Sequence, residues 1–134
     1  MNTITLLSPD GLVASPAFSH VAVVPPGAAT VYIGGQNAVD ETGALVGGDD
    51  AAAQTRKVMA NLVTALEGAG VALGDVVSMT VLLVDGVDVV AAYGAASESL
   101  AGLEPPPLVT AALVSALGVP GALVEVGAIA AVMP

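Results

Sequence analysis

Glycine and proline divide this strongly apolar chain into short segments, each about as long as one strand or one helix. The chain has 134 residues, of which 55% are hydrophobic, together with 16 glycines and 9 prolines. Residues 108–124 carry no charge, but Gly118, Pro120 and Gly121 interrupt them. A membrane-spanning helix needs about 20 apolar residues without such breaks. We therefore expect the buried strands of a globular fold rather than a membrane protein.

Cationic and metal-binding side chains are scarce. The chain has no cysteine, one histidine and only two cations, Arg56 and Lys57, and its net charge is −10. Without cysteine it has no disulfide, thiol nucleophile or thiolate metal site, and one histidine cannot build a structural zinc site. Nucleic-acid binding depends on clusters of Lys and Arg at the phosphates. We therefore exclude DNA and RNA as partners, and the negative field also disfavours anionic substrates.

The length is enough for one compact domain with a real core, so we predict a single domain over residues 1–134. The first residues, MNTITLLSPDG, have neither the basic nor the hydrophobic region of a signal peptide. This predicts a cytoplasmic protein. The apolar content exceeds the usual share, and we expect part of it to be buried between the subunits of a homo-oligomer.

The expected elements follow the order β-β-α-β-α-β-β. β-branched and aromatic residues indicate strands, and glycine or proline marks where they end. Two helices on one face of a mixed sheet give an α+β layer architecture. The expected strands are residues 20–24, 30–36, 75–84, 108–117 and 122–132, and the expected helices are residues 51–67 and 89–100.

The helix over residues 51–67 has the clearest start signal. Asp49 and Asp50 precede it, and an aspartate at the N-cap accepts hydrogen bonds from the free N–H groups of the first turn. Helical periodicity places Met59 and Leu62 on one face, which we expect to be buried. Gln54 is expected to lie largely on another face.

Glu125 is the acidic residue that a surface position explains least well. The other acidic residues lie at expected turns, element ends or helix surfaces, whereas Glu125 lies in the apolar run LVEVG. Strand alternation puts Leu123, Glu125 and Gly127 on one face and Val124 and Val126 on the other. A carboxylate in such a strand must be paired, hydrogen-bonded or protonated if it is buried. Burial favours the protonated form, which suits general acid/base chemistry. The simpler alternative is that this face of the sheet is wet.

Gly34 and Gly35, near the end of the strand over residues 30–36, are the second unusual feature. Two adjacent glycines allow another group to approach the backbone closely. N–H groups exposed there could hold an oxyanion or a carbonyl oxygen, although a β-bulge or a turn explains the pair equally well. The pair is not a phosphate loop, because the chain has neither GxxxxGK[ST] nor GxGxxG.

Five other polar side chains have weaker claims to a site. His20 is the only imidazole, and we expect it to be structural or at the surface. Ser19 beside it does not define a Ser-His-Asp triad. Thr110, Tyr32 and Tyr93 carry hydroxyl groups that a site could use, although such residues are more often part of ordinary packing.

Five segments, in this order, resemble the Rid family, the YjgF-like reactive intermediate deaminases whose older label is L-PSP endoribonuclease. The segments are SPAFSHVAVV, TVYIGGQNAVDETGALVGG, AAQTRKVMANLVTALEGAGVALGDVVSMTVLL, PPPLVT and GALVEVGAIAAV. The resemblance covers about residues 15–132. Its most specific parts are the GGQ strand, the helix that begins with Gln-Thr-Arg and contains Asn61, and the final VEVGAIA strand.

The resemblance implies a chorismate-mutase-like fold and a homotrimer, in which three sheets form a central barrel and three sites lie in the clefts between subunits. It also implies hydrolysis of enamines or imines, such as 2-aminoacrylate, to ketones or keto acids and ammonia, with no metal or organic cofactor. The family's catalytic glutamate, which positions a water and transfers protons, falls on Glu125. The family's Ser-Gly pair falls on Gly34 and Gly35, so that the backbone N–H of Gly35 is kept and the serine hydroxyl is lost.

Three other family positions carry different side chains in this chain. The pocket tyrosine falls on Phe18, which keeps the ring without the hydroxyl. The arginine that binds a substrate carboxylate falls on Val109, which Thr110 follows, and a frequent cysteine falls on Ala111. Arginine binds a carboxylate through two charge-assisted hydrogen bonds, and valine cannot replace them.

The expected pocket is therefore apolar. Phe18, Val109 and Ala111 form its walls, with Leu113 as a further candidate, and Asn37 joins Glu125 and the Gly35 N–H as its polar groups. Such a pocket suits a small, neutral carbonyl compound, imine or enamine.

Two functions fit these observations. The first is a Rid-family enzyme that acts on such a neutral intermediate, with Glu125 as general acid and base and the Gly35 N–H polarising the electrophile. The alternative is a non-catalytic trimer of the same fold that binds a small molecule or another protein. A ribonuclease is excluded, because each chain has two cations against 12 acidic residues.

Overall fold

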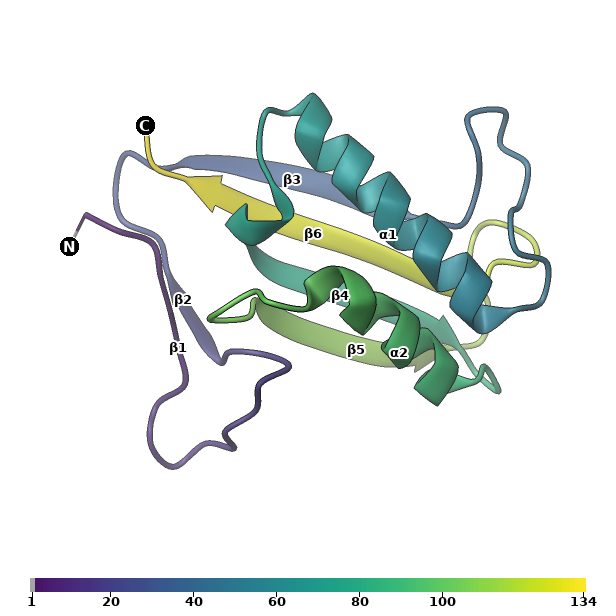
Figure 1. Ribbon diagram of the computed structural model, residues 1–134, viewed down its shortest axis with the longest axis horizontal. Helices are drawn as coiled ribbons and strands as arrows, with labels where there is room; N and C mark the ends of the chain where they lie inside the picture. The colour runs from purple at the N-terminus through teal and green to yellow at the C-terminus, as the bar shows by residue number, and fades with distance from the viewer. Residues whose placement is uncertain (1) are drawn as a thin grey trace.

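A four-stranded mixed sheet with two helices packed on one of its faces forms the body of the protein, as seen in a computed structural model that describes residues 2–134 (Figure 1). The α+β fold class is confirmed. The elements are β1 (Thr5–Leu7), β2 (Val21–Val23), β3 (Ala29–Gln36), α1 (Ala51–Gly68), the short 3₁₀ turn η1 (Leu73–Asp75), β4 (Val76–Val84), α2 (Val89–Leu100), β5 (Leu108–Val114) and β6 (Val124–Val132).

The main sheet has the strand order β3-β6-β4-β5. β6 pairs antiparallel with both β3 and β4, whereas β4 and β5 are parallel because the crossover through α2 returns the chain to the same end. β5 is an edge strand whose ladder with β4 ends at the pair Val84 and Val114. It therefore ends three residues before the predicted boundary at residue 117.

Strand β1 is not among the elements expected from the sequence. This strand pairs antiparallel with β2 and forms a two-stranded ribbon that is separate from the main sheet. The ribbon lies toward the end of the molecule where both chain termini lie (Figure 1).

Helix α1 begins as predicted, because the Asp50 carboxylate accepts a hydrogen bond of 3.0 Å from the N–H of Ala53. Its Met59 and Leu62 are almost completely buried against the sheet. Gln54 differs from the prediction, because it is completely buried. Its side chain makes three hydrogen bonds to backbone groups of two loops, at 2.6 Å to Gly48, 2.9 Å to Gly121 and 2.8 Å to Leu123. These bonds remove the cost of burying the amide.

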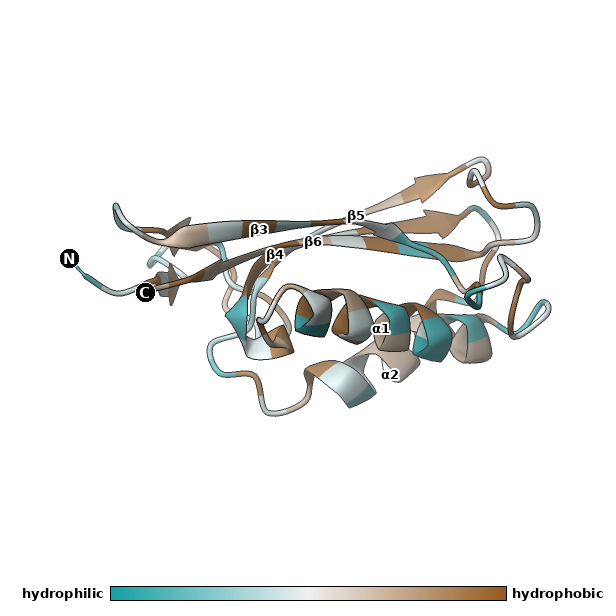
Figure 2. Ribbon diagram, turned by 90° about the horizontal axis from the view of Figure 1, so that it is seen from above, coloured by the Kyte–Doolittle hydropathy of each residue, from teal (hydrophilic) through white to brown (hydrophobic). Residues whose placement is uncertain are grey.

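Both helices lie on the same side of the main sheet, and within residues 2–134 no element covers its other face (Figure 2). The hydrophobic core lies between the two layers, where α1 packs against β3 and β6, and α2 packs against α1. On the uncovered face Tyr32 is 76% exposed. None of the helices in residues 2–134 is long and apolar enough to cross a membrane.

Candidate functional site

Glu125 lies on the uncovered face of the sheet. Its neighbours Val124 and Val126 are buried beneath the helices, and the alternation of β6 turns Glu125 to the opposite side, where it is half-buried. Within residues 2–134 its carboxylate has no hydrogen-bond or ion-pair partner. An unpaired carboxylate on this open face remains free to accept a hydrogen bond from a water or a ligand.

Gly35 lies directly against the Glu125 side chain. A Cβ atom at position 35 would lie 2.5 Å from Oε2 and 2.7 Å from Cδ of Glu125, closer than non-bonded atoms approach. Only glycine therefore fits here with the carboxylate in its present position. The pairing of β3 with β6 also shifts at this point, so that Gly34 and Gly35 together lie opposite Gly127 in a β-bulge. The pair of glycines is thus a bulge that also accommodates the carboxylate.

Asn37 lies at the end of β3, beside the same strand as Glu125. Its side-chain amide donates a hydrogen bond of 3.4 Å to the carbonyl oxygen of Val124, and its own carbonyl accepts one of 2.9 Å from Asn61. In the single chain the first bond fastens the end of β3 to β6, and the second fastens it to α1. They hold the bulge and Glu125 in a fixed relation.

Phe18 is held in place by the residue that follows it. The hydroxyl of the buried Ser19 donates to the carbonyl oxygen of Pro106 at 2.6 Å, and the Ser19 N–H donates to that of Pro107 at 3.1 Å. His20 packs its ring edge-on against Phe18, with the ring centres 5.4 Å apart. Its Nε2 lies 2.7 Å from the carbonyl oxygen of Val13. Its contacts are those of a structural histidine, as predicted, and Ser19 has a positioning role that the sequence alone did not indicate.

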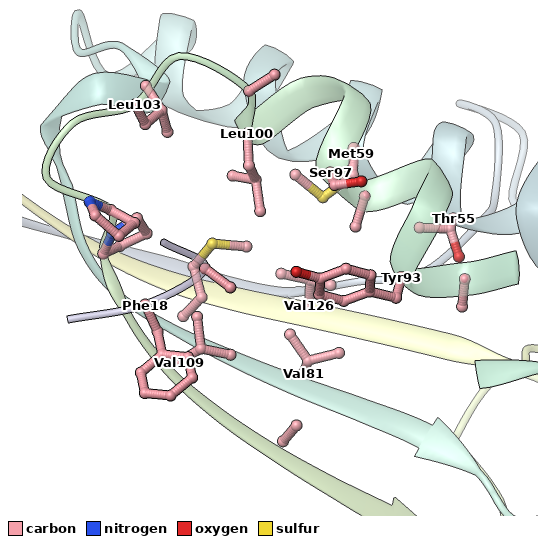
Figure 3. A pocket seen from close by; sticks show the side chains of 18 of the residues that line it. Phe18, Thr55, Met59, Val81, Tyr93, Ser97, Leu100, Leu103, Val109 and Val126 are labelled. Atoms are coloured by element: carbon pink, nitrogen blue, oxygen red, sulfur yellow. The ribbon is translucent and has the colours of Figure 1, made fainter. Parts of the chain in front are cut away.

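Phe18, Val109 and Ala111 line one apolar cavity of about 650 Å³ between α2 and the strands β4 and β5 (Figure 3). Met59 of α1 and Met79 of β4 form part of its wall. These three predicted wall residues are therefore together, whereas the fourth candidate, Leu113, is 58% exposed and does not line the cavity. The volume lies within the range of small-molecule sites in proteins.

The sheet separates this cavity from Glu125. Val109 and Ala111 pair with Met79 and Val81 of β4, whose side chains face the helices and line the cavity. Glu125 pairs with Leu82, the residue that follows Val81 in β4. Because successive side chains of a strand point to opposite faces, Glu125 and the cavity lie on opposite sides of the sheet. We predicted one pocket containing both, but a single chain does not bring them together.

Thr110 and Gly34 lie on the same side as Glu125. Thr110 is exposed. It pairs with Thr80, which pairs on its other side with Gly127, and the three residues form a row across the uncovered face. A Cβ atom added at Gly34 would have no other atom within 4 Å, so this position faces open space. The structure therefore divides the predicted site into an uncovered polar half around Glu125 and an apolar half under α2.

Neither cation lines the cavity. Arg56 forms an exposed ion pair with Glu98 through two hydrogen bonds of 3.2 Å, which link α1 to α2. These bonds lower the pKa of Glu98 below its ordinary value and raise the pKa of Arg56. Glu104 is the one charged residue among the lining residues, so the cavity offers nothing that would attract an anion. No group of His, Asp and Glu side chains in residues 2–134 is arranged to hold a metal ion.

Tyr93 also belongs to this region, although its sequence context favours ordinary packing. It lines the cavity from α2, and Figure 3 shows its ring between the helix and the strands. The available signal was its helical spacing from Val89 and Leu100, which also line the cavity. That spacing alone could not show that an open space lies beneath the helix.

Comparison with known proteins identifies the family. Residues 10–132 match the family described as endoribonuclease L-PSP. The chain belongs to the Rid family. A Rid-family protein of unknown function from Yersinia pestis, YyfB, is similar in structure, with a TM-score of 0.84 at 32% sequence identity over 98% of this chain and 100% of that one.

Two further Rid-family structures agree with this assignment. RidA from the Antarctic bacterium Psychrobacter shares 32% identity over 98% of this chain and 100% of that chain, with a TM-score of 0.68. Rv2704 from Mycobacterium tuberculosis, a member of the YjgF/YER057c/UK114 family, shares 27% identity over 97% and 100%, with a TM-score of 0.64. No significant relative was found among the curated proteins. The resemblance stated from the sequence and the Rid fold are confirmed, and the residue roles remain predictions.

Proposed function

We propose that this Rid-family protein is a hydrolase that converts a small, neutral imine or enamine into a carbonyl compound and ammonia, without a cofactor. The observation that carries the proposal is the Glu125 carboxylate, which lies unpaired against Gly35 on the uncovered face of the sheet. Family membership makes an enzymatic or small-molecule-binding role the expected one.

The chemistry needs one group that first accepts and then donates a proton. Glu125 removes a proton from a water molecule as the water oxygen bonds to the imine carbon, and it passes this proton to the nitrogen, on which the C=N π electrons have become a lone pair. In the resulting amino alcohol Glu125 removes the hydroxyl proton and delivers it to the nitrogen, so that the C–N bond breaks as the C=O bond forms and ammonia leaves. The backbone N–H of Gly35 assists by donating a hydrogen bond to the group on which negative charge develops. An enamine enters the same sequence after protonation at carbon.

The charge distribution supports a neutral substrate. Val109 occupies the wall of the cavity where the family resemblance places an arginine, and the lining includes no cation. Arg56 is paired with Glu98 on the helix surface. A substrate carboxylate would therefore lose its hydration in the cavity without gaining a partner, which costs several kcal/mol or more.

The division of the site between two sheet faces supports a site shared between subunits. Glu125 and Gly35 lie on the uncovered face, whereas Val109 and Phe18 line the cavity on the helix side. One substrate molecule can meet both groups only if a second copy of the chain supplies one of them. The homotrimer implied by the family resemblance meets this need, and it would also cover the exposed Tyr32.

The direct test is an assay of benzophenone imine hydrolysis, in which the rate for this neutral ketimine is measured from the ammonia released. We expect the native protein to be active and Glu125→Gln to lose at least about 100-fold in rate, because general acid/base groups contribute about 10²- to 10⁴-fold. Glu67→Gln is the matched control, since Glu67 is exposed at the end of α1. Equal activity in the native protein and in Glu125→Gln would contradict the proposed role of Glu125.

The second candidate is a non-catalytic binding module. It is favoured by the cavity, which is formed without any contribution from Glu125. Under this alternative no imine is hydrolysed, and Glu125→Gln leaves ligand binding unchanged.

A further inference from the structure

Only one hydroxyl group in the wall of the cavity is free to bind a ligand. Three hydroxyl-bearing side chains line the cavity. The Thr55 hydroxyl donates to the carbonyl oxygen of Ala51 at 2.7 Å, and the Ser97 hydroxyl donates to that of Gly94 at 2.9 Å. Both acceptors belong to the same helix as the donor. The hydroxyl of Tyr93 has no partner within the described part of the chain.

Tyr93 is placed where a ligand can reach it. Val89, Tyr93, Ala96 and Leu100 follow one another at helical spacing along the side of α2 that borders the cavity. Because Ala96 is small, the helix does not fill the space beneath it. Tyr93 is 60% exposed, and its ring lies between α2 and the strands (Figure 3). Its hydroxyl can therefore meet a molecule that enters from solvent.

The remaining wall limits the chemistry of that molecule. It consists mainly of apolar side chains, among them Met59, Met79, Val81 and Val126, and it contains no cation. An apolar wall favours an apolar body. A buried acceptor on the ligand needs a donor, because an unpaired polar group in such a site is costly. Tyr93 is the side chain that can supply it.

We propose that this cavity binds a neutral, largely apolar molecule with a single carbonyl or imine acceptor, and that the Tyr93 hydroxyl donates the hydrogen bond that selects it. Tyr93 is thus a specificity-determining residue. The proposal rests on the proposed function only for the claim that such a molecule is the substrate. Within one chain Glu125 lies on the other face of the sheet, so the cavity wall is formed without it.

The experiment uses three probes of similar size: acetophenone with a carbonyl acceptor, ethylbenzene without one, and the anion benzoate. Binding to the native full-length protein is measured by titration calorimetry. We expect acetophenone to bind and benzoate to bind at least tenfold more weakly. Tyr93→Phe, which removes only the hydroxyl, should weaken acetophenone binding by about 3- to 10-fold, the usual size of one hydrogen bond, and should not weaken ethylbenzene binding.

Two controls locate the binding. Tyr32→Phe makes the same chemical change on the uncovered face of the sheet and should leave all three affinities unchanged. Ala96→Phe fills the cavity and should abolish binding of both neutral probes while the circular dichroism spectrum stays native. If Ala96→Phe does not fold, Ala111→Leu makes the equivalent change from β5.

Four results would overturn the proposal: no binding of either neutral probe, benzoate binding as tight as acetophenone binding, an acetophenone affinity that Tyr93→Phe leaves unchanged, or binding that survives filling of the cavity. The same titrations on Glu67→Gln, which changes an exposed residue at the end of α1, should match those on the native protein. Binding without imine hydrolysis would therefore reject the proposed function alone. Hydrolysis with failure of the acetophenone series would reject this inference alone.

Discussion

Replacing Gly35 by alanine tests the contact on which the proposed site depends. A Cβ atom there would lie 2.5 Å from Oε2, 2.7 Å from Cδ and 3.0 Å from Cγ of Glu125, whereas carbon atoms normally approach to about 3.5–4.0 Å. The Glu125 side chain must therefore move by about 1 Å. Gly34→Ala is the matched control, because the same position on Gly34 has open space around it and neither glycine has a positive φ angle.

The expected change in the free energy of unfolding follows from two opposing effects. Gly→Ala at a compatible site stabilises a protein by about 0.4–1 kcal/mol, because it restricts the unfolded chain. Gly34→Ala should show this gain. Gly35→Ala has the same gain but also forces Glu125 into a less favourable position, at a cost of about 1–2 kcal/mol. The cost stays at this lower end of overpacking because the half-buried carboxylate can rotate toward solvent.

The assay is urea unfolding of each glycine variant, alone and combined with Glu125→Ala, at one fixed protein concentration, since subunit association also contributes to stability. We expect Gly34→Ala and Gly35→Ala to differ by about 1–2 kcal/mol in the native background and to be alike when the Glu125 side chain is absent. A cost of Gly35→Ala that is the same in both backgrounds would refute the contact. The displaced carboxylate should also lower imine hydrolysis by about 100-fold, since a 1 Å misplacement has effects of that size.

Three further predictions concern other parts of the molecule. Gln54→Leu removes all three hydrogen bonds of a completely buried amide. It should lower the free energy of unfolding by about 2–4 kcal/mol, because backbone groups are left unpaired. Urea unfolding measures this change, and a loss below about 1 kcal/mol would contradict the prediction. Hydrogen bonds from the side chain and backbone of Thr42 and from the backbone of Ala44 lower the pKa of Asp40 below 3.8. Its contribution to stability is therefore complete above that pH and is lost as the pH falls through the lower folded-state pKa. Asp40→Asn should flatten the acid limb of a plot of urea midpoint against pH, and an unchanged limb would argue against the shift. Val109→Arg should raise the rate of 2-aminoacrylate hydrolysis about tenfold or more, because it supplies a charge-assisted hydrogen bond to the substrate carboxylate. A native protein that is already active on 2-aminoacrylate would show that the arginine is dispensable.

Local patterns in the sequence predicted several features of the site correctly. Asp50 caps α1 because a side-chain oxygen next to the first turn always has free N–H groups within reach. Glu125 faces away from Val124 and Val126 because alternation along a strand is a property of the backbone. The same periodicity did not reveal that Gln54 would be buried, since its partners Gly121 and Leu123 are nearly 70 residues away in the sequence.

By itself, the sequence determined the order and type of the main elements, the family, the near absence of cations and the glycines that permit close approach. The tertiary structure alone decided how these parts meet. It placed Gly35 against Glu125 through the pairing of β3 with β6, and it put Val109 on the opposite side of the sheet from Glu125 through the parallel pairing of β4 with β5. It also left open space beneath α2, which turns Tyr93 from a packing residue into a candidate ligand contact. The physical reason is that periodicity along a strand or helix acts within a few residues, whereas the choice of neighbouring strands and of the covered face depends on contacts between segments far apart in the chain.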